Sequence, residues 1–249
     1  MFSLSRRRLA EHVAGQQGFE LIVESNDDLL SICSSLVPGT LLVRWVEDEQ
    51  FAVDVDLPLV RDALAQEFSI LDAQGARARD DIELYTLMGR AFQLCMSLPD
   101  RPLQKFTSET FGLPSTTEGE RLVLQRIGQG IFREALEEYW KGCCAITGIG
   151  DRDLLRASHI KPWAESTDSE RLDVYNGILL AAHLDAAFDK HLFTISESGG
   201  LVLSTRRLGV ASIEILNAGG PSPCIRLADR HQSYLAVHRA RFMALEAMG

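Results

Sequence analysis

Four polar residues between positions 159 and 189 have the types and the spacing that hydrolysis of a phosphodiester bond requires. The reaction needs a base that deprotonates water, a divalent cation that neutralises negative charge, and a group that holds the base in the correct orientation. A histidine can act as the base because its ordinary pKa lies near neutral pH, and paired carboxylates can bind a hard cation. The residues that offer these groups are His159, Asn176, Asp185 and Asp189.

The local sequence predicts how two of these side chains are presented. His159 follows a short apolar run and precedes Ile160 and a Pro-Trp turn, which predicts the end of a strand beside a cleft. Asn176 opens an Asn-Gly turn, where its side-chain amide can hold backbone or imidazole groups. Its role would be to orient, since an amide is neither an acid nor a base.

Asp185 and Asp189 stand four residues apart on a predicted helix, so both carboxylates lie on one face and can share a cation such as Mg²⁺. Asp189 could instead pair with Lys190 or cap backbone groups. His183 and His191 flank the same helix. Either histidine could replace one carboxylate as a ligand, or both could belong to a solvated face.

The strings around these residues resemble the HNH endonuclease family, and the resemblance covers residues 118–204. The branch concerned has the signature Cys-x-x-Thr-Gly, Ala-x-His-Ile-x-Pro-Trp, Asn-Gly followed by three apolar residues, and Leu-(Asp/His)-x-x-Phe-Asp. The order and spacing of these strings make the resemblance specific. In this chain the strings are Cys144–Gly148, Ala157–Trp163, Asn176–Leu180 and Leu184–Asp189.

The resemblance implies both a fold and a function. His159 would be the general base, Asn176 would brace the loop, and Asp185 and Asp189 would hold Mg²⁺ or Mn²⁺. The fold class implied is α+β, with a C-terminal ββα-metal (HNH, or His-Me finger) domain flanked by helices. The activity implied is endonucleolytic hydrolysis of double-stranded DNA that leaves 5′ phosphates, in restriction or anti-phage defence. A homodimer is expected because double-strand cutting by such a site needs two copies.

The chain departs from the family at two places. Many members have a metal-binding Asp or His directly before the general base, where this chain has Ser158. Water or a phosphate oxygen would then fill the third ligand position. Many members also bind a structural zinc through two Cys-x-x-Cys pairs, but here Cys144 is followed by Thr147-Gly148 where the second cysteine would fall. We therefore expect no structural zinc.

A helix that precedes the motif is a candidate DNA contact. Arg126, Gln129 and Arg133 form a polar stripe at helical spacing, which fits a contact with the DNA backbone and equally fits a solvated face. Lys161, beside the general base, is a further candidate for DNA binding. Polar residues of the last predicted helix could extend this surface: His231, Tyr234, His238, Arg239 and Arg241.

The element pattern predicts two domains. Residues 1–98 are expected to form a mixed α/β domain of unknown type for recognition or sensing, 99–117 a Pro-containing linker or wrapped loop, and 118–249 the nuclease domain. The predicted elements are strands at 19–23, 40–46 and 51–55, a turn across 47–50, helices at 27–36, 58–67, 80–98, 117–140 and 229–248, and a hairpin at 192–204.

The composition indicates a soluble, globular, cytoplasmic protein. No apolar run reaches the ~18–20 residues of a membrane helix, and five scattered cysteines do not form a disulfide framework. A formal net charge of −10 argues against a nucleic-acid partner. The acidity lies mainly in residues 1–117, with 10 Lys and Arg against 18 Asp and Glu, whereas residues 118–249 have 15 against 17.

Two further hypotheses follow from these features. Ser158 and the acidic charge are also compatible with a DNA- or protein-binding module that keeps the fold and has lost the chemistry. Alternatively, the N-terminal domain could bind a small-molecule or protein signal that activates the nuclease.

Overall fold

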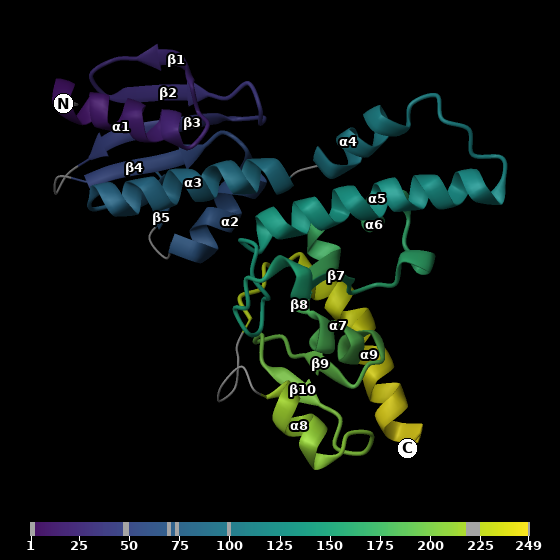
Figure 1. The fold of residues 1–249 in the computed structure, drawn as a ribbon. Helices are drawn as coiled ribbons and strands as arrows, with labels where there is room; N and C mark the ends of the chain where they lie inside the picture. The colour runs from purple at the N-terminus through teal and green to yellow at the C-terminus, as the bar shows by residue number, and fades with distance from the viewer. Residues whose placement is uncertain are drawn as a thin grey trace. The chain divides into compact units, whose positions relative to one another are not determined.

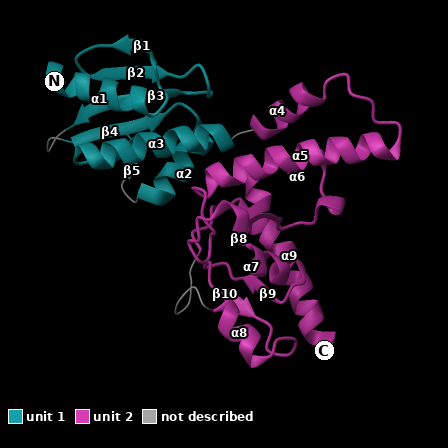
Figure 2. Cartoon of the chain, in the orientation of Figure 1, with its two compact units in different colours: residues 1–99 teal, residues 100–249 magenta. Residues whose placement is uncertain are grey.

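A computed structural model describes residues 3–46, 50–68, 71–72, 75–98, 101–217 and 225–248. The chain has a mixed α+β fold and divides into two compact units, residues 1–99 and residues 100–249 (Figure 2). Each unit has its own core and is described by itself. In the described ranges, no helix is both long enough and apolar enough to cross a membrane.

Unit 1 is an antiparallel sheet packed against helices (Figure 1). The strand order is β1-β2-β3-β4-β6-β5. Leu41 and Val43 of β3 are buried and alternate with partly exposed residues, as expected for a sheet with one face toward a core. The bounds are α1 Leu4–Gln16, β1 Leu21–Ser25, β2 Leu29–Cys33, β3 Thr40–Val46, β4 Gln50–Val55, α2 Pro58–Phe68, β5 Leu71–Asp72, β6 Gly75–Ala78 and α3 Asp81–Ser97.

One predicted element of unit 1 is wrong. The helix expected at 27–36 is replaced by β2, which pairs with β1 and β3. The Asn26 side chain accepts hydrogen bonds from the backbone N–H groups of Asp28 and Leu29, which closes a tight turn between β1 and β2. The hairpin of β3 and β4 and the helices α2 and α3 are confirmed. Residues 47–49 of the predicted turn lie outside the described residues.

Unit 2 begins with two helices, α4 (Arg101–Thr110) and α5 (Glu118–Tyr139), of which α5 starts as predicted. Thr117 accepts a hydrogen bond from the N–H of Glu120, whose carboxylate accepts one from the N–H of Thr117, a capping box. Helix α4 lies within the segment 99–117, where a linker without regular structure was expected, so that prediction is wrong for α4. Pro102 is tolerated there because it occupies the first turn, whose N–H groups need no helical partner.

The remaining elements of unit 2 follow α5 in chain order. The hairpin predicted at 192–204 is confirmed as β9 and β10, and the last helix is confirmed as α9. The bounds are α4 Arg101–Thr110, α5 Glu118–Tyr139, η2 Arg152–Leu154, β7 Leu155–His159, η3 Trp163–Glu165, α6 Asp168–Leu172, η4 Val174–Asn176, β8 Gly177–Ala181, α7 Ala182–Asp189, β9 Phe193–Ile195, β10 Leu201–Leu203, α8 Val210–Leu216 and α9 His231–Met248.

Strands β7 and β8 form an antiparallel hairpin with a helix packed on each side. His159 pairs with Gly177, and this face contacts α5: the His159 ring stacks on Phe132. Ser158 pairs with Ile178 on the opposite face, because side chains alternate along a strand. Helix α7 contacts both strands. The hairpin therefore separates α5 from α7.

Gly177 allows α5 to approach this hairpin closely. A Cβ at this position would lie 2.5 Å from Phe132 Cζ and 2.7 Å from Leu136 Cδ1, both in α5. We predict that Gly177→Ala destabilises the protein by ~1–3 kcal/mol because the packed interface must move. Gly130→Ala, in the same helix but with no atom within 4 Å of its new Cβ, should stabilise by ~0.5–1 kcal/mol. Denaturant titrations measure both effects, and equal midpoints for Gly177→Ala and the wild type would refute this packing argument.

Candidate active site

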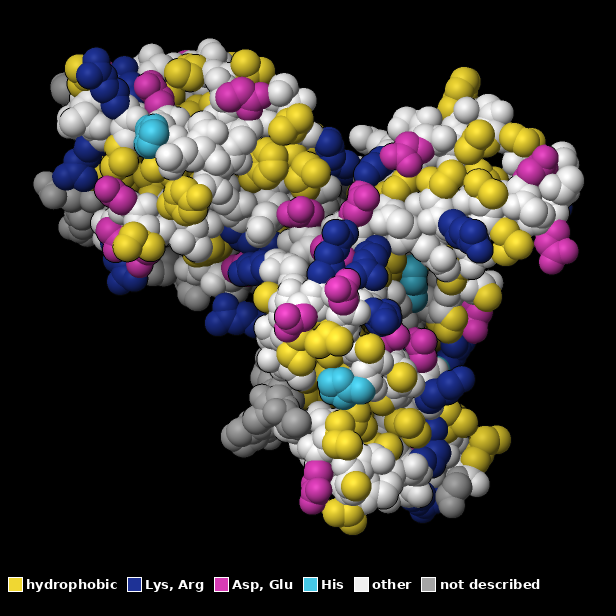
Figure 3. Space-filling view, viewed as in Figure 1, with side chains coloured by type: hydrophobic (Ala, Val, Ile, Leu, Met, Phe, Trp, Pro, Cys, Tyr) yellow, Lys and Arg dark blue, Asp and Glu magenta, His cyan; other side chains and the backbone are white. Residues whose placement is uncertain are grey.

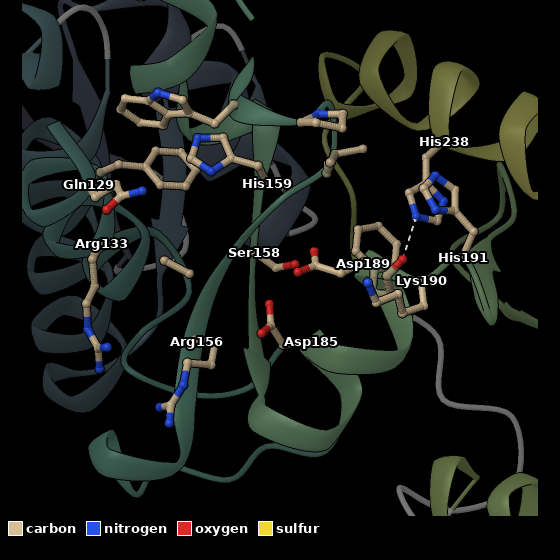
Figure 4. A pocket seen from close by; sticks show the side chains of 16 residues that line it. Gln129, Arg133, Arg156, Ser158, His159, Asp185, Asp189, Lys190, His191 and His238 are labelled. Carbon is tan, nitrogen blue, oxygen red and sulfur yellow. Dashed lines mark hydrogen bonds between the residues drawn. The ribbon is translucent and has the colours of Figure 1, made fainter. Parts of the chain in front are cut away.

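A cavity of about 580 Å³ lies in unit 2 (Figure 4). Five consecutive residues, 156–160, contribute to its wall, so side chains from both faces of β7 reach it. The cavity must therefore run along the edge of β7 that is not paired with β8. Its lining residues are Gln129, Phe132 and Arg133 of α5, residues 156–160, Pro162, Trp163, Asp185, Phe188 and Asp189 of α7, Lys190, His191, and His238 of α9.

His159 lines this cavity with its ring held on three sides. The ring stacks on Phe132, with centroids 3.8 Å apart, and meets the edge of Trp163 at 5.4 Å. Nε2 lies 2.9 Å from the backbone oxygen of Arg171. A carbonyl can only accept, so Nε2 carries the proton and Nδ1 keeps its lone pair. Burial lowers the pKa of His159, and this effect outweighs the opposing hydrogen bond to Arg171.

Asn176 braces the segment that supplies this carbonyl. The Asn176 side chain is fully buried, and its Oδ1 accepts a hydrogen bond of 2.8 Å from the N–H of Lys161. Its Nδ2 donates to the backbone oxygen of Glu170 at 2.9 Å and to Ser166 Oγ at 3.3 Å. The loop is therefore fixed at both ends by one amide. Its contacts are with backbone and a hydroxyl and do not include the imidazole.

Asp185 and Asp189 line the cavity from α7, one helical turn apart. Partial desolvation of its carboxyl and the negative charge of Asp185 both raise the pKa of Asp189. Ser158 enters the same cavity from β7, and Figure 4 shows its side chain directed toward the two carboxylates. In the part of the chain that the structure describes, no three His, Cys, Asp or Glu residues form a metal-binding group.

The two alternative histidine ligands differ in their surroundings. His183 is exposed and does not line the cavity. His191 lines the cavity and stacks on His238, with ring centroids 4.3 Å apart. Its backbone has a φ of 52°, which is uncommon for a residue other than glycine. Burial lowers the pKa of His191, which favours the neutral ring.

Only some of the residues predicted to contact DNA lie at the cavity. Gln129 and Arg133 line it, but Arg133 also forms an ion pair of 2.8 Å with Glu137. Arg126 is exposed on α5 outside the lining. Lys161 is absent from the lining, and its ammonium contacts Glu170 at 2.7 Å.

Sequence reasoning missed two cations that line the cavity, Arg156 and Lys190. Arg156 is exposed, and its guanidinium donates to the backbone oxygens of Asp153 and Leu155 at 3.0 and 2.7 Å. Both acceptors are neutral backbone oxygens, so these hydrogen bonds do not neutralise the positive charge of Arg156. The signal was present: Arg156 is two residues before Ser158, so both lie on one face of β7.

Two histidines of α9 are structural and do not form a DNA-binding surface. His238 is 2% exposed; its Nε2–H donates to the oxygen of Phe188 at 3.1 Å, and Thr194 Oγ1 donates to its Nδ1 at 2.9 Å. His231 is fully buried beside Tyr139, and burial lowers its pKa to about 4. The expectation of DNA contacts from these two rings is wrong.

The other polar residues of α9 have partners within unit 2. Tyr234 donates to Asp173 at 3.0 Å, and burial together with the charge of Asp173 raises the pKa of Tyr234 above its usual range. Arg239 donates to the backbone oxygen of Ile195, and Arg241 pairs with Glu165.

Cys144 has hydrogen-bonding partners of its own. Its Sγ accepts from the backbone N–H of Ala181 at 3.2 Å and from that of Thr147 at 3.5 Å. Gly148 follows with a φ of 72°, and its N–H donates to the oxygen of Cys144. The thiol thus links the Cys-x-x-Thr-Gly turn to the end of β8. Cys224 lies outside the described residues.

Comparison with known proteins gives a family for this region. No curated protein matches the chain. A family model described as HNH endonuclease matches residues 144–196, which include β7, β8, α7 and β9. The segment 144–196, which contains His159, Asn176, Asp185 and Asp189, thus matches the HNH endonuclease family.

Proposed function

We propose that unit 2 hydrolyses phosphodiester bonds of DNA in a reaction that depends on a divalent metal ion. The observation that carries this proposal is the state of His159. Its proton is held on Nε2 by the Arg171 carbonyl, which leaves the lone pair of Nδ1 available in a cavity that also contains two carboxylates. This arrangement supports a base beside a cation site, as a ββα-metal site requires.

In the proposed reaction, Nδ1 of His159 takes a proton from the attacking water. The ring becomes an imidazolium, and its Nε2–H continues to donate a hydrogen bond to the Arg171 carbonyl. The ring therefore keeps its orientation during the transfer. Phe132 and Trp163 restrict rotation of the ring. Asn176 acts as a positioning residue, because it holds the loop that supplies this carbonyl.

The residues of α7 fit a hard divalent cation. Asp185 and Asp189 offer carboxylate oxygens on one face of the helix; desolvation and the charge of Asp185 raise the pKa of Asp189, and a bound cation would offset both effects. When bound, the ion would stabilise charge on the phosphate and on the departing 3′ oxygen. Mg²⁺ or Mn²⁺ is the ion that oxygen ligands favour.

The charges around the cavity support an anionic substrate in spite of the net charge of −10. Arg156, Lys190 and Gln129 offer donors at its wall. In the view of Figure 3, Asp and Glu alternate with Lys and Arg over the visible described surface, so the negative charge is not gathered into one patch on that face. We assign target recognition or sensing to unit 1, and restriction or anti-phage defence to the whole chain, by family analogy.

The second candidate is a module that binds DNA without cutting it. One observation favours it: Ser158 replaces the acid that many HNH enzymes have before the base. A plasmid assay distinguishes the two functions, because only the nuclease would cleave the DNA.

We predict that the protein nicks supercoiled plasmid with Mg²⁺ or Mn²⁺ and that chelator abolishes the activity. His159→Ala should lower the rate by about 10²–10⁴-fold, the usual contribution of a general base. His183→Ala is the matched control, since His183 is exposed outside the cavity, and it should cut like the wild type. Equal nicking by the wild type and His159→Ala would instead favour the binding module.

The pH dependence of cutting should reflect the lowered pKa of His159. The base form is the neutral ring, so the rate should rise with pH through the pKa, and a lowered pKa moves the midpoint below the ordinary 6.5. With saturating metal, single-turnover rates should reach their plateau at a lower pH than a base with the ordinary histidine pKa allows, and they should fall as the ring becomes protonated. A midpoint above 6.5 would contradict a base in this buried position.

Arg156 should bind a substrate phosphate. We predict that Arg156→Ala weakens DNA binding several-fold for all sequences and reduces the slope of log affinity against log salt by about 1. Fluorescence anisotropy with a DNA duplex at several salt concentrations measures both quantities. Arg206→Ala is the control, because Arg206 is outside the cavity lining and donates to the backbone oxygen of Glu246. An unchanged slope for Arg156→Ala would exclude the contact.

A further inference from the structure

The hydroxyl of Ser158 is a buried polar group that lacks a partner. Ser158 is 2% exposed, and its Oγ has no hydrogen-bond partner among the residues that the structure describes. Buried hydroxyls nearly always find a partner, since leaving one unpaired costs free energy. Alanine would fill the same place on β7 without this cost. The hydroxyl therefore requires an explanation that packing does not provide.

The surroundings of Ser158 indicate what the missing partner is. Its neighbours across the cavity are Asp185 and Asp189, and Figure 4 shows the Ser158 side chain directed toward these carboxylates. The cross-strand neighbour on its own face, Ile178, offers no polar side chain. Three oxygen-bearing side chains thus converge from two elements, β7 and α7. A group of oxygen ligands with two negative charges suits a hard divalent cation.

We propose that Ser158 Oγ is the third protein ligand of the divalent cation held by Asp185 and Asp189. The inference rests on the proposed function and adds a residue of this chain to its metal site. A neutral hydroxyl leaves the site with two carboxylates and not three. The free protein should therefore bind the ion weakly, and a phosphate of the substrate should complete the binding.

The first test measures binding of Mn²⁺ by electron paramagnetic resonance on the full chain without DNA. Ser158→Ala should weaken binding by about tenfold, and Ser158→Asp should tighten it because it adds a charged oxygen ligand. Ser97→Ala is the matched control: Ser97 is 1% exposed in unit 1, but its hydroxyl donates to the oxygen of Gln93. This control should bind Mn²⁺ like the wild type.

The second test makes contact at position 158 visible by spectroscopy. Ser158→Cys places a thiol there, and a bound metal deprotonates a coordinating thiol. With Co²⁺, this variant should show a thiolate-to-metal charge-transfer band that the wild type, with its own five cysteines, does not show. The band should disappear when Asp185→Asn is added.

The outcomes separate this inference from the proposed function. If the wild type binds Mn²⁺ but Ser158→Ala binds it equally and Ser158→Cys gives no band, the ligand role of Ser158 is overturned and the aspartate site stands. If the wild type binds no Mn²⁺ even at millimolar concentration, with or without duplex DNA, the metal site of the proposed function fails together with this inference. Weaker binding by Ser158→Ala together with the band establishes the contact.

Discussion

The hydrogen bond from Nε2–H of His159 to the carbonyl of Arg171 is the constraint on which the candidate site depends. It decides which nitrogen bears the proton, and it holds the ring against Phe132. The carbonyl belongs to α6, one of three short helices (η3, α6 and η4) in the segment between β7 and β8, and these helices are too short to be stable by themselves. That segment is therefore anchored by side chains: the buried amide of Asn176 and the capping box of α6, formed by Thr167 and Glu170.

The fold could be predicted where one local pattern determined the element. The hydroxyl of Thr117 and the acids that follow it predicted the start of α5, and short apolar runs on either side of a turn predicted the hairpin of β3 and β4. The pattern failed at 27–36, where the apolar residues fit a helical face but the Asn26 side chain closes a turn and β2 gains partners on both sides. Strand formation depends on the cross-strand partners that a segment gains, and the spacing of its own apolar residues does not indicate these partners.

The residue types of the candidate site could also be predicted, because the motif fixes their order. Their partners could not, since partners come from the packing of elements distant in sequence. The alternation of β7 predicts that Arg156 and Ser158 share a face, but not that the Oγ of Ser158 has no hydrogen-bond partner within the described ranges. Likewise, no sequence pattern indicates that Lys161 is bound by Glu170, or that Gly128 accommodates the ring of Trp163.

The unpaired edge of β7 brings two neighbouring residues, one from each face, to the same cavity. His159 and Ser158 are joined by a single peptide bond. Thermal fluctuations of the strand therefore displace the imidazole and the hydroxyl together, and the distance between the two groups changes little. The spacing of these two groups therefore does not depend on the loops around the cavity, whereas the orientation of the His159 ring does depend on the Arg171 carbonyl. The backbone of β7 thus fixes the spacing of these two groups, and the hydrogen bonds to β8 along the opposite edge hold that backbone in its extended conformation.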